Sequence, residues 1–245
     1  MNILCIIPAR YASSRFPGKP LAEIAGKTMI ERVYQQSKKS KCIQKVLVAT
    51  DDERIYNHIV SFGGNVIMTN ADHPSGTDRC FEAYQNLDEH FDFVINIQGD
   101  EPFISPDQVD LLASVLQPEV ELATLVKKID SQEEIMDPNE AKVVINKSDE
   151  AIYFSRSPIP FLNQSNPDWT QSGDYYKHVG IYAYRTDILK EITQLDVSTL
   201  EVTESLEQLR WIQNGYKIKV AVTNFESMCI DTPEDIEEAI VRYNL

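Results

Sequence analysis

Three basic side chains without an acidic neighbour follow the first apolar run of the chain. Arg10, Arg15 and Lys19 come after Ile3–Ile7, and residues 1–21 contain no Asp or Glu, whereas the whole chain has 38 acidic against 23 basic residues. Ligands of open α/β sheets bind beyond the carboxyl ends of strands, and such cations pair with phosphate. The loop therefore indicates an anion site, with a solvated basic loop as the open alternative.

Two acidic places in the sequence suit a metal–phosphate site. Asp100 follows the apolar run 91–97, and Asp231 stands just before Thr232 and Pro233. Thr232 is a predicted N-cap, Pro233 is at the first helical position, and Asp235 is at position N3 of a predicted capping box. Mg²⁺ typically takes one or two carboxylates together with phosphate oxygens and water. Asp100 and Asp231 fit that need if the fold brings them together; an ordinary turn residue is the alternative for Asp100.

The elements that must position these side chains alternate along the chain, which predicts an α/β fold with a mainly parallel central sheet flanked by helices. The predicted strands are 2–8, 45–50, 66–69, 91–97, 121–129, 141–146, 151–155, 179–184 and 216–222. The predicted helices are 29–37, 52–60, 78–87, 106–116, 187–195, 203–214 and 233–243. The second half is less regular, with a proline-rich loop at 158–173.

Composition excludes several classes of function. The net charge of −15 argues against nucleic-acid binding and against docking on anionic lipid. No apolar run approaches membrane-spanning length, so we expect no membrane insertion and a cytoplasmic protein. The cysteines, at 5, 42, 80 and 229, have no zinc-type spacing, and Cys5 and Cys229 are predicted to be buried thiols. Dinucleotide-binding and P-loop motifs are absent from the sequence.

Several sequence blocks together resemble the 3-deoxy-manno-octulosonate (Kdo) cytidylyltransferases, in matching order over essentially the whole length. The blocks are IPARYASSRFPGKPL (7–21), ATDDERI (49–55), SGTDR (75–79), NIQGDEP (96–102), YFSRSPIP (153–160), KHVGIYAY (177–184), LEVTESLEQLRW (200–211) and IDTPED (230–235).

This resemblance implies a Rossmann-like nucleotidyltransferase fold and a Mg²⁺-dependent transfer of CMP from CTP to Kdo, giving CMP-Kdo and pyrophosphate for lipopolysaccharide synthesis. It further implies one domain over 1–245, with an irregular dimerisation and sugar-binding portion at about 125–190, and a homodimer. Two alternatives stay open. One is a cytidylyltransferase for a related sugar acid, 8-amino-Kdo or sialic acid, and the other is a non-catalytic nucleotide-binding regulator.

The resemblance also implies roles for individual residues. The predicted catalytic residues are Lys19, Asp100 and Asp231. The predicted nucleotide-binding residues are Ala9, Arg10, Arg15, Lys19, Ser75 and Arg79, and the predicted metal ligands are Asp100, Asp231 and Asp235. The predicted sugar-binding residues are Gln98, Arg156, His178, Tyr182, Glu204 and Gln208.

Within the sugar set, Arg156 suits the sugar carboxylate because a guanidinium fork matches two oxygens. Glu204 and Gln208 are four residues apart, so we expect one helix face to present both. Four of these residues also have a structural alternative: a first-turn acid favoured by the helix dipole for Glu204, a core residue for Tyr182, a buried hydrogen bond for His178, and bonds to loop carbonyls near Pro158 and Pro160 for Arg156.

Overall fold

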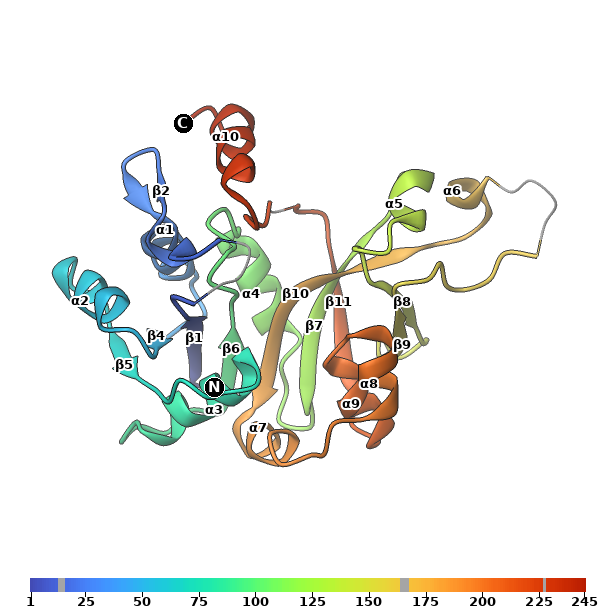
Figure 1. Cartoon of the computed structure of the whole chain (residues 1–245). Coiled ribbons are helices and arrows are strands. Elements are labelled where there is room, and N and C mark those ends of the chain that lie inside the picture. Colours follow the sequence, from blue (N-terminus) through green and yellow to red (C-terminus); the bar gives the residue numbers. More distant parts are fainter. Residues whose placement is uncertain (13–15, 164–167, 227) are drawn as a thin grey trace. The chain divides into compact units, whose positions relative to one another are not determined.

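The computed structural model describes residues 1–12, 16–163, 168–226 and 228–245 (Figure 1). The chain forms two compact units. The first comprises Met1–Asp110 and Glu226–Leu245, and the second comprises Leu111–Phe225. Residues from both ends of the sequence thus build the first unit, which places the Asp231 segment in the same unit as the basic loop.

Parallel strands form the centre of the first unit, in the order β6-β1-β4-β5. They are β1 (Ile3–Ala9), β4 (Lys45–Thr50), β5 (Val66–Met68) and β6 (Phe93–Asn96). Leu4, Cys5, Ile6 and Ile7 are fully buried, as expected for a parallel strand covered on both faces. Since parallel strands end at one edge, the segments after β1, β4 and β6 begin close together.

Three helices with capped starts, α1 (Met29–Ser37), α2 (Glu53–Ser61) and α3 (Gly76–Gln85), lie between these strands in the sequence. The unit also contains the 3-10 turn η1 (Lys19–Leu21), the short strands β2 (Glu23–Ile24) and β3 (Lys27–Thr28), and the last helix, α10 (Pro233–Arg242). Thr28, Asp52 and Ser75 cap α1, α2 and α3 with their side-chain oxygens. The boundary between the units falls within α4 (Pro106–Ser114).

The second unit has a mixed sheet. Strand β7 (Leu122–Lys128) pairs in parallel with β11 (Ile218–Thr223) and antiparallel with β10 (Tyr176–Arg185), while β8 (Lys142–Ile145) pairs antiparallel with β10 and with β9 (Ala151–Ser155). Its helices are α5 (Gln132–Met136), α6 (Trp169–Ser172), α7 (Thr186–Ile192), α8 (Thr199–Glu204) and α9 (Gln208–Gln213).

The predicted α/β fold with a central sheet flanked by helices is confirmed. The predicted bounds 29–37, 45–50 and 151–155 coincide with those of α1, β4 and β9. The structure adds the short elements η1, β2, β3, α5 and α6, which carry too few residues for a periodic pattern. One domain over 1–245, with a dimerisation and sugar-binding portion at about 125–190, stays a prediction.

The predicted helix 203–214 is wrong, because the chain turns after α8. Ser205 adopts a left-handed backbone with φ of 54°, and the Leu206 amide donates to the Glu201 carbonyl, which closes the helix. Arg210 of α9 then makes two side-chain bonds to Glu201, at 2.7 and 2.6 Å, across the corner. Glu204 ends one helix and Gln208 begins the next, so they do not share a helix face.

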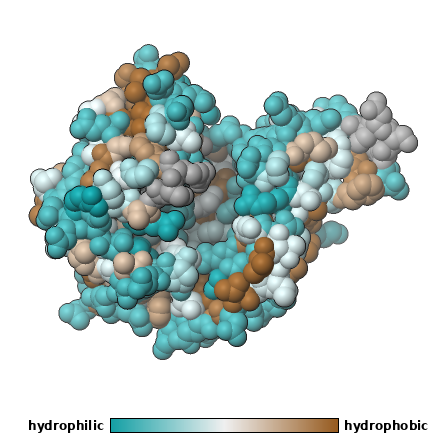
Figure 2. Space-filling model, viewed as in Figure 1, coloured by the Kyte–Doolittle hydropathy of each residue, from teal (hydrophilic) through white to brown (hydrophobic). Residues whose placement is uncertain are grey.

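The surface agrees with the charged composition. Hydrophilic residues cover most of the face of each unit that is visible in Figure 2, and apolar residues form separate patches. Over the described ranges of the chain, no helix has both the length and the apolar character needed to cross a bilayer.

Candidate active site

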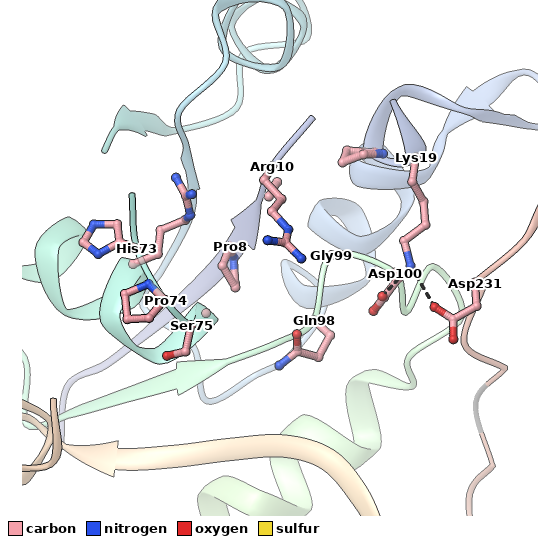
Figure 3. A pocket seen from close by; sticks show the side chains of 14 residues that line it. Pro8, Arg10, Lys19, His73, Pro74, Ser75, Gln98, Gly99, Asp100 and Asp231 are labelled. Atoms are coloured by element: carbon pink, nitrogen blue, oxygen red, sulfur yellow. Dashed lines mark hydrogen bonds and ion pairs between the residues drawn. The ribbon is translucent and has the colours of Figure 1, made fainter. Parts of the chain in front are cut away.

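A cavity of about 350 Å³ lies in the first unit (Figure 3). Its walls come from the end of β1, from η1, from the start of α3, from the loop after β6 and from the segment before α10. The lining residues are Pro8, Ala9, Arg10, Lys19, Pro20, His73, Pro74, Ser75, Gly76, Arg79, Gln98, Gly99, Asp100 and Asp231. The cavity is large enough for a small-molecule ligand, and it combines basic with acidic side chains.

Glycine at position 99 lets the loops after β1 and β6 approach each other. A Cβ atom at Gly99 would lie only 2.9 Å from the Pro8 carbonyl oxygen, too close for any other residue without a shift of the backbone. Figure 3 shows Arg10 directed toward Gly99, and Lys19 directed toward Asp100 and Asp231. The glycine of the QGDEP segment is therefore needed to place Gln98 and Asp100 beside the basic loop.

Lys19 joins the two predicted acidic positions. Its Nζ donates to Asp100 Oδ2 at 2.6 Å and to Asp231 Oδ1 at 3.1 Å, and also to the Ile230 carbonyl oxygen at 2.8 Å. Burial lowers the pKa of Lys19, but the charges and hydrogen bonds of Asp100 and Asp231 outweigh it and raise the pKa above its usual value. The ammonium group thus stays charged and holds two carboxylates that would otherwise repel each other.

The residue before Asp231 fixes that side chain in place. Ile230 is fully buried against Ile24, Met29 and Ala239, and its amide donates to the Asp100 carbonyl oxygen at 3.0 Å. This cluster draws α10 beside the start of α1, although the two helices lie near opposite ends of the sequence (Figure 1). Apolar packing and one backbone hydrogen bond therefore bring Asp100 and Asp231 together.

Asp235 serves as the partner in the capping box of α10, as the sequence indicated. Its Oδ2 accepts hydrogen bonds from the amides of Asp231 and Thr232, both at 2.7 Å. Burial raises the pKa of Asp235. The hydrogen bonds from these amides and from the Thr232 hydroxyl, together with the charge of Lys19, lower the pKa by more, so it lies below its usual value. A metal-binding role for Asp235 stays a prediction.

One group of possible metal ligands lies in the described part of the first unit. Ligand atoms of Asp100, Cys229 and Asp231 all lie within 4.8 Å of one another. The Cys229 residue is exposed, so its predicted burial is wrong, whereas Cys5 is buried as predicted. The carboxylates of Asp100 and Asp231 supply the hard oxygen ligands that Mg²⁺ prefers.

The opposite wall of the cavity carries the predicted base-binding residues. Arg79 is buried, with Nη1 at 2.7 Å from Thr69 Oγ1 and 3.2 Å from Asp51 Oδ1. Ser75 Oγ caps α3 and also donates to Asp78 Oδ2 at 2.6 Å. His73, whose Nε2 is hydrogen-bonded to Glu82 Oε2, lines the cavity too and was not among the predicted residues. Its position two residues before Ser75, the first residue of the SGTDR block, was an available signal. Arg15 lies outside the described residues.

The predicted sugar-binding residues are divided between the units. Gln98 lines the cavity of the first unit. In the second unit, His178 and Tyr182 flank an irregularity in β10, where the pairing with β7 shifts between Val179 and Tyr182. Their ring centres are 5.0 Å apart, and Thr124 Oγ1 lies 3.1 Å from His178 Nε2.

Buried polar atoms accompany this pair. Burial lowers the pKa of His178 to about 4, so the ring is neutral at neutral pH. Burial, with the nearby Tyr184 and Glu207, raises the pKa of Tyr182 well above its usual value. The Tyr182 hydroxyl and Gln208 Nε2 are buried without a hydrogen-bond partner among the described residues. Because such groups cost free energy when left unpaired, both are suited to a polar ligand.

Glu204 and Arg156 bind each other and the surrounding backbone. Glu204 Oε1 accepts from Ser155 Oγ at 2.7 Å, and Glu204 Oε2 accepts from the Arg156 amide at 2.9 Å. The Arg156 guanidinium donates to the carbonyl oxygens of Glu204 at 2.8 Å, Pro138 at 2.9 Å and Ser205 at 3.3 Å. These bonds match the structural alternative for Arg156, with carbonyls other than those of Pro158 and Pro160.

Comparisons with known proteins identify the family. A cytidylyltransferase family model matches residues 4–218. The chain is 58% identical to the 3-deoxy-manno-octulosonate cytidylyltransferase of Cytophaga hutchinsonii, over 96% of this chain and 95% of the relative, and 54% identical to that of Parabacteroides distasonis, over 98% and 97%. The chain belongs to the 3-deoxy-manno-octulosonate cytidylyltransferase family. The family predicted from the sequence blocks is thereby confirmed.

A solved structure agrees with this membership of the cytidylyltransferase family. It is a CMP:2-keto-3-deoxy-manno-octonic acid synthetase complexed with CTP, with a TM-score of 0.92 and 42% identity over 100% of both chains. At this identity the likeness extends beyond the fold to the sequence itself. The roles assigned above to single residues of this cytidylyltransferase stay predictions.

Proposed function

We propose that the chain transfers CMP from CTP to 3-deoxy-D-manno-octulosonate (Kdo), giving CMP-Kdo and pyrophosphate. The observation that carries this proposal is the cavity in which Lys19 bridges Asp100 and Asp231, in a chain similar over its full length to a synthetase solved with CTP. We also propose that the enzyme works in the cytoplasm, supplies lipopolysaccharide synthesis and forms a homodimer.

The basic side of the cavity suits the triphosphate. Arg10 directly follows β1 and Lys19 begins η1, and both line the cavity, where they would neutralise phosphate oxygens. Arg15 is a further predicted contact. In the reaction, the anomeric hydroxyl of the sugar attacks the α-phosphorus, loses its proton, and pyrophosphate leaves in line. Such a transfer needs no covalent enzyme intermediate and depends mostly on positioning and charge stabilisation.

The acidic side of the cavity suits Mg²⁺. Asp100 and Asp231 would hold the metal, since their carboxylates already lie within reach of one another, and Asp235 would assist through water. When bound, the metal supplies positive charge to the triphosphate and lowers the pKa of a hydroxyl that it coordinates. Lys19 keeps the two carboxylates together.

The α3 side of the cavity suits the cytosine base. Ala9, Ser75 and Arg79 line this wall, and Arg79 is fixed by Asp51 and Thr69. A rigid polar wall can discriminate by hydrogen bonding, because a wrong base would leave its buried groups unpaired.

The sugar acid is assigned to Kdo on the names of the curated relatives. Of the predicted sugar contacts, Tyr182 and Gln208 have the clearest capacity for a ligand, since their buried polar atoms have no partner among the described residues. Gln98 and His178 are further proposed contacts. The Glu204 carboxylate is engaged by Ser155 and Arg156, so sugar binding there would require an exchange of bonds.

A substrate matrix tests the proposed function. Pyrophosphate release is measured with CTP, UTP or ATP, each combined with Kdo, 8-amino-Kdo or sialic acid, in Mg²⁺ buffer. We expect CTP with Kdo to give kcat/KM at least about tenfold above every other pair, because polar groups fitted to one ligand penalise another. A higher kcat/KM with a different sugar acid would replace Kdo as the assigned substrate. Nucleotide binding without any turnover would contradict the proposal that the protein is an enzyme.

Substitution of Arg156 distinguishes a structural role, in which it bonds backbone carbonyls, from binding of the sugar carboxylate. Its guanidinium bonds join three carbonyl oxygens, so we expect Arg156→Lys to lower the melting temperature by about 2–6 °C, because lysine cannot make the same set of bonds. Steady-state kinetics should then show similar decreases in kcat/KM for CTP and for Kdo. An unchanged melting temperature with a raised KM for Kdo alone would instead assign Arg156 to the sugar carboxylate.

A further inference from the structure

In the ATDDERI block, Asp51 holds Arg79, but Asp52 and Arg54, which follow the strand next to the basic loop, have no role in the proposed chemistry. In the parallel pair of β1 and β4, Ala9 is in register with Thr50. Two residues beyond each lie Tyr11 and Asp52. The register therefore places the start of the basic loop beside the start of α2.

Arg54 connects these two segments. Its Cζ lies 3.3 Å from the centre of the Tyr11 ring, a cation–π contact of a closely stacked kind. Asp52 holds the same guanidinium with two bonds, Oδ1 to Nε at 2.9 Å and Oδ2 to Nη2 at 2.6 Å. Asp52 is itself fixed as the N-cap of α2, and its amide donates to Thr50 Oγ1 at 3.2 Å. The guanidinium thus presents a fixed planar face to Tyr11.

Tyr11 in turn closes the basic loop. Its carbonyl oxygen accepts from the Gly18 amide at 3.0 Å, and its ring lies against the Gly18 backbone, where a Cβ atom would be 3.0 Å from Tyr11 Cζ. Gly18 has φ of 75°, a conformation that glycine adopts without strain. The neighbours of this closing pair along the chain are the proposed triphosphate ligands Arg10 and Lys19.

We infer that Arg54, held by Asp52, is a positioning residue that keeps Tyr11 against Gly18 and so sets the spacing of Arg10 and Lys19 for the triphosphate. The inference rests on the proposed function, because it assigns these two cations to CTP. Arg54 itself is exposed and need not contact the nucleotide. Its effect on binding passes through the ring of Tyr11.

Equilibrium binding of CTP, measured by calorimetry in Mg²⁺ buffer without sugar, tests this inference. We expect Arg54→Ala to raise the Kd of CTP about threefold to fivefold and Tyr11→Ala to raise it about tenfold, since the loop ends then lose their fixed spacing. Tyr11→Phe keeps the ring and should bind CTP within about twofold of wild type. Arg54→Lys should fall between wild type and Arg54→Ala, because lysine lacks the planar stacking face.

A double variant distinguishes positioning from general stabilisation of α2. If Arg54 acts through Tyr11, Arg54→Ala should add nothing to the Kd of CTP in a Tyr11→Ala background, because coupled residues are not additive. The matched control is Arg242→Ala, which removes another exposed arginine near a tyrosine ring of the same unit, 5.9 Å from the centre of Tyr243, and should leave CTP binding unchanged.

Each result has a defined meaning. Wild-type CTP affinity in both Arg54→Ala and Tyr11→Ala would overturn the positioning role, and so would a lowered melting temperature with unchanged CTP binding. Additive effects in the double variant would show that Arg54 acts separately from Tyr11 and would also overturn it. Failure of the wild-type protein to bind CTP would overturn the proposed function itself, which these variants do not decide.

Discussion

Replacing Asp100 or Asp231 by asparagine should lower turnover by at least about a hundredfold, because each substitution removes a charged ligand from a metal–polyphosphate site. Asparagine keeps the size of the side chain, and both carboxylates are partly exposed, so the fold should survive. The measurement is kcat for pyrophosphate release from CTP and Kdo, at saturating substrates and at increasing Mg²⁺. Circular dichroism melting of each variant accompanies it.

Two further variants make this prediction specific to the acidic pair. Asp107→Asn alters an exposed acid in the first turn of α4 and should retain wild-type turnover. Asp235→Asn should lower turnover much less than Asp100→Asn or Asp231→Asn, since the asparagine oxygen can still accept the two amide hydrogen bonds of the capping box. Near-normal turnover in Asp100→Asn or Asp231→Asn, with Mg²⁺ limiting, would show that the acid is only a turn or pre-cap residue.

Removing the charge of Lys19 should have the second largest effect. Lys19→Met keeps much of the length of the side chain but leaves Asp100 and Asp231 without the ammonium that joins them. We expect a rise of about tenfold to a hundredfold in KM for CTP, together with slower transfer, because a charge-assisted contact is lost and two like charges are left facing each other. KM for Kdo should change less.

A lysine of the same unit provides the control for this variant. Lys27 bonds Gln35 on the surface and lies 3.8 Å from Glu31, so Lys27→Met should leave both KM values unchanged. Kinetics of Lys19→Met that match those of Lys27→Met would remove the basic loop from the nucleotide site.

The acidic pair illustrates what the sequence could predict. Asp100 was recognisable because it follows an apolar strand, and Asp231 because the capping box left it unexplained. Their approach depends on the burial of Ile230 with Ile24 and Met29 and on a backbone bond to Asp100. Such contacts join distant parts of the chain, and no local pattern in one sequence shows them.

The sugar side illustrates where local reasoning failed. Periodicity through 203–214 suggested one helix, but Ser205 breaks it with a left-handed backbone that is uncommon for serine. A usable signal was present upstream, since Ser198 and Glu201 have the spacing of a capping box and predict a helix start at 199. The orphaned hydroxyl of Tyr182 could not be foreseen, because hydrogen-bond satisfaction depends on neighbours in space.

Phosphorus NMR of the wild-type protein with CTP, Kdo and Mg²⁺ is the decisive test of the proposed transfer of CMP from CTP to Kdo. We expect the CTP resonances to disappear only when Kdo is present, and CMP-Kdo and pyrophosphate to appear in equal amounts. CTP that stays intact beside Kdo, or CTP that is broken down equally well without Kdo, would contradict it.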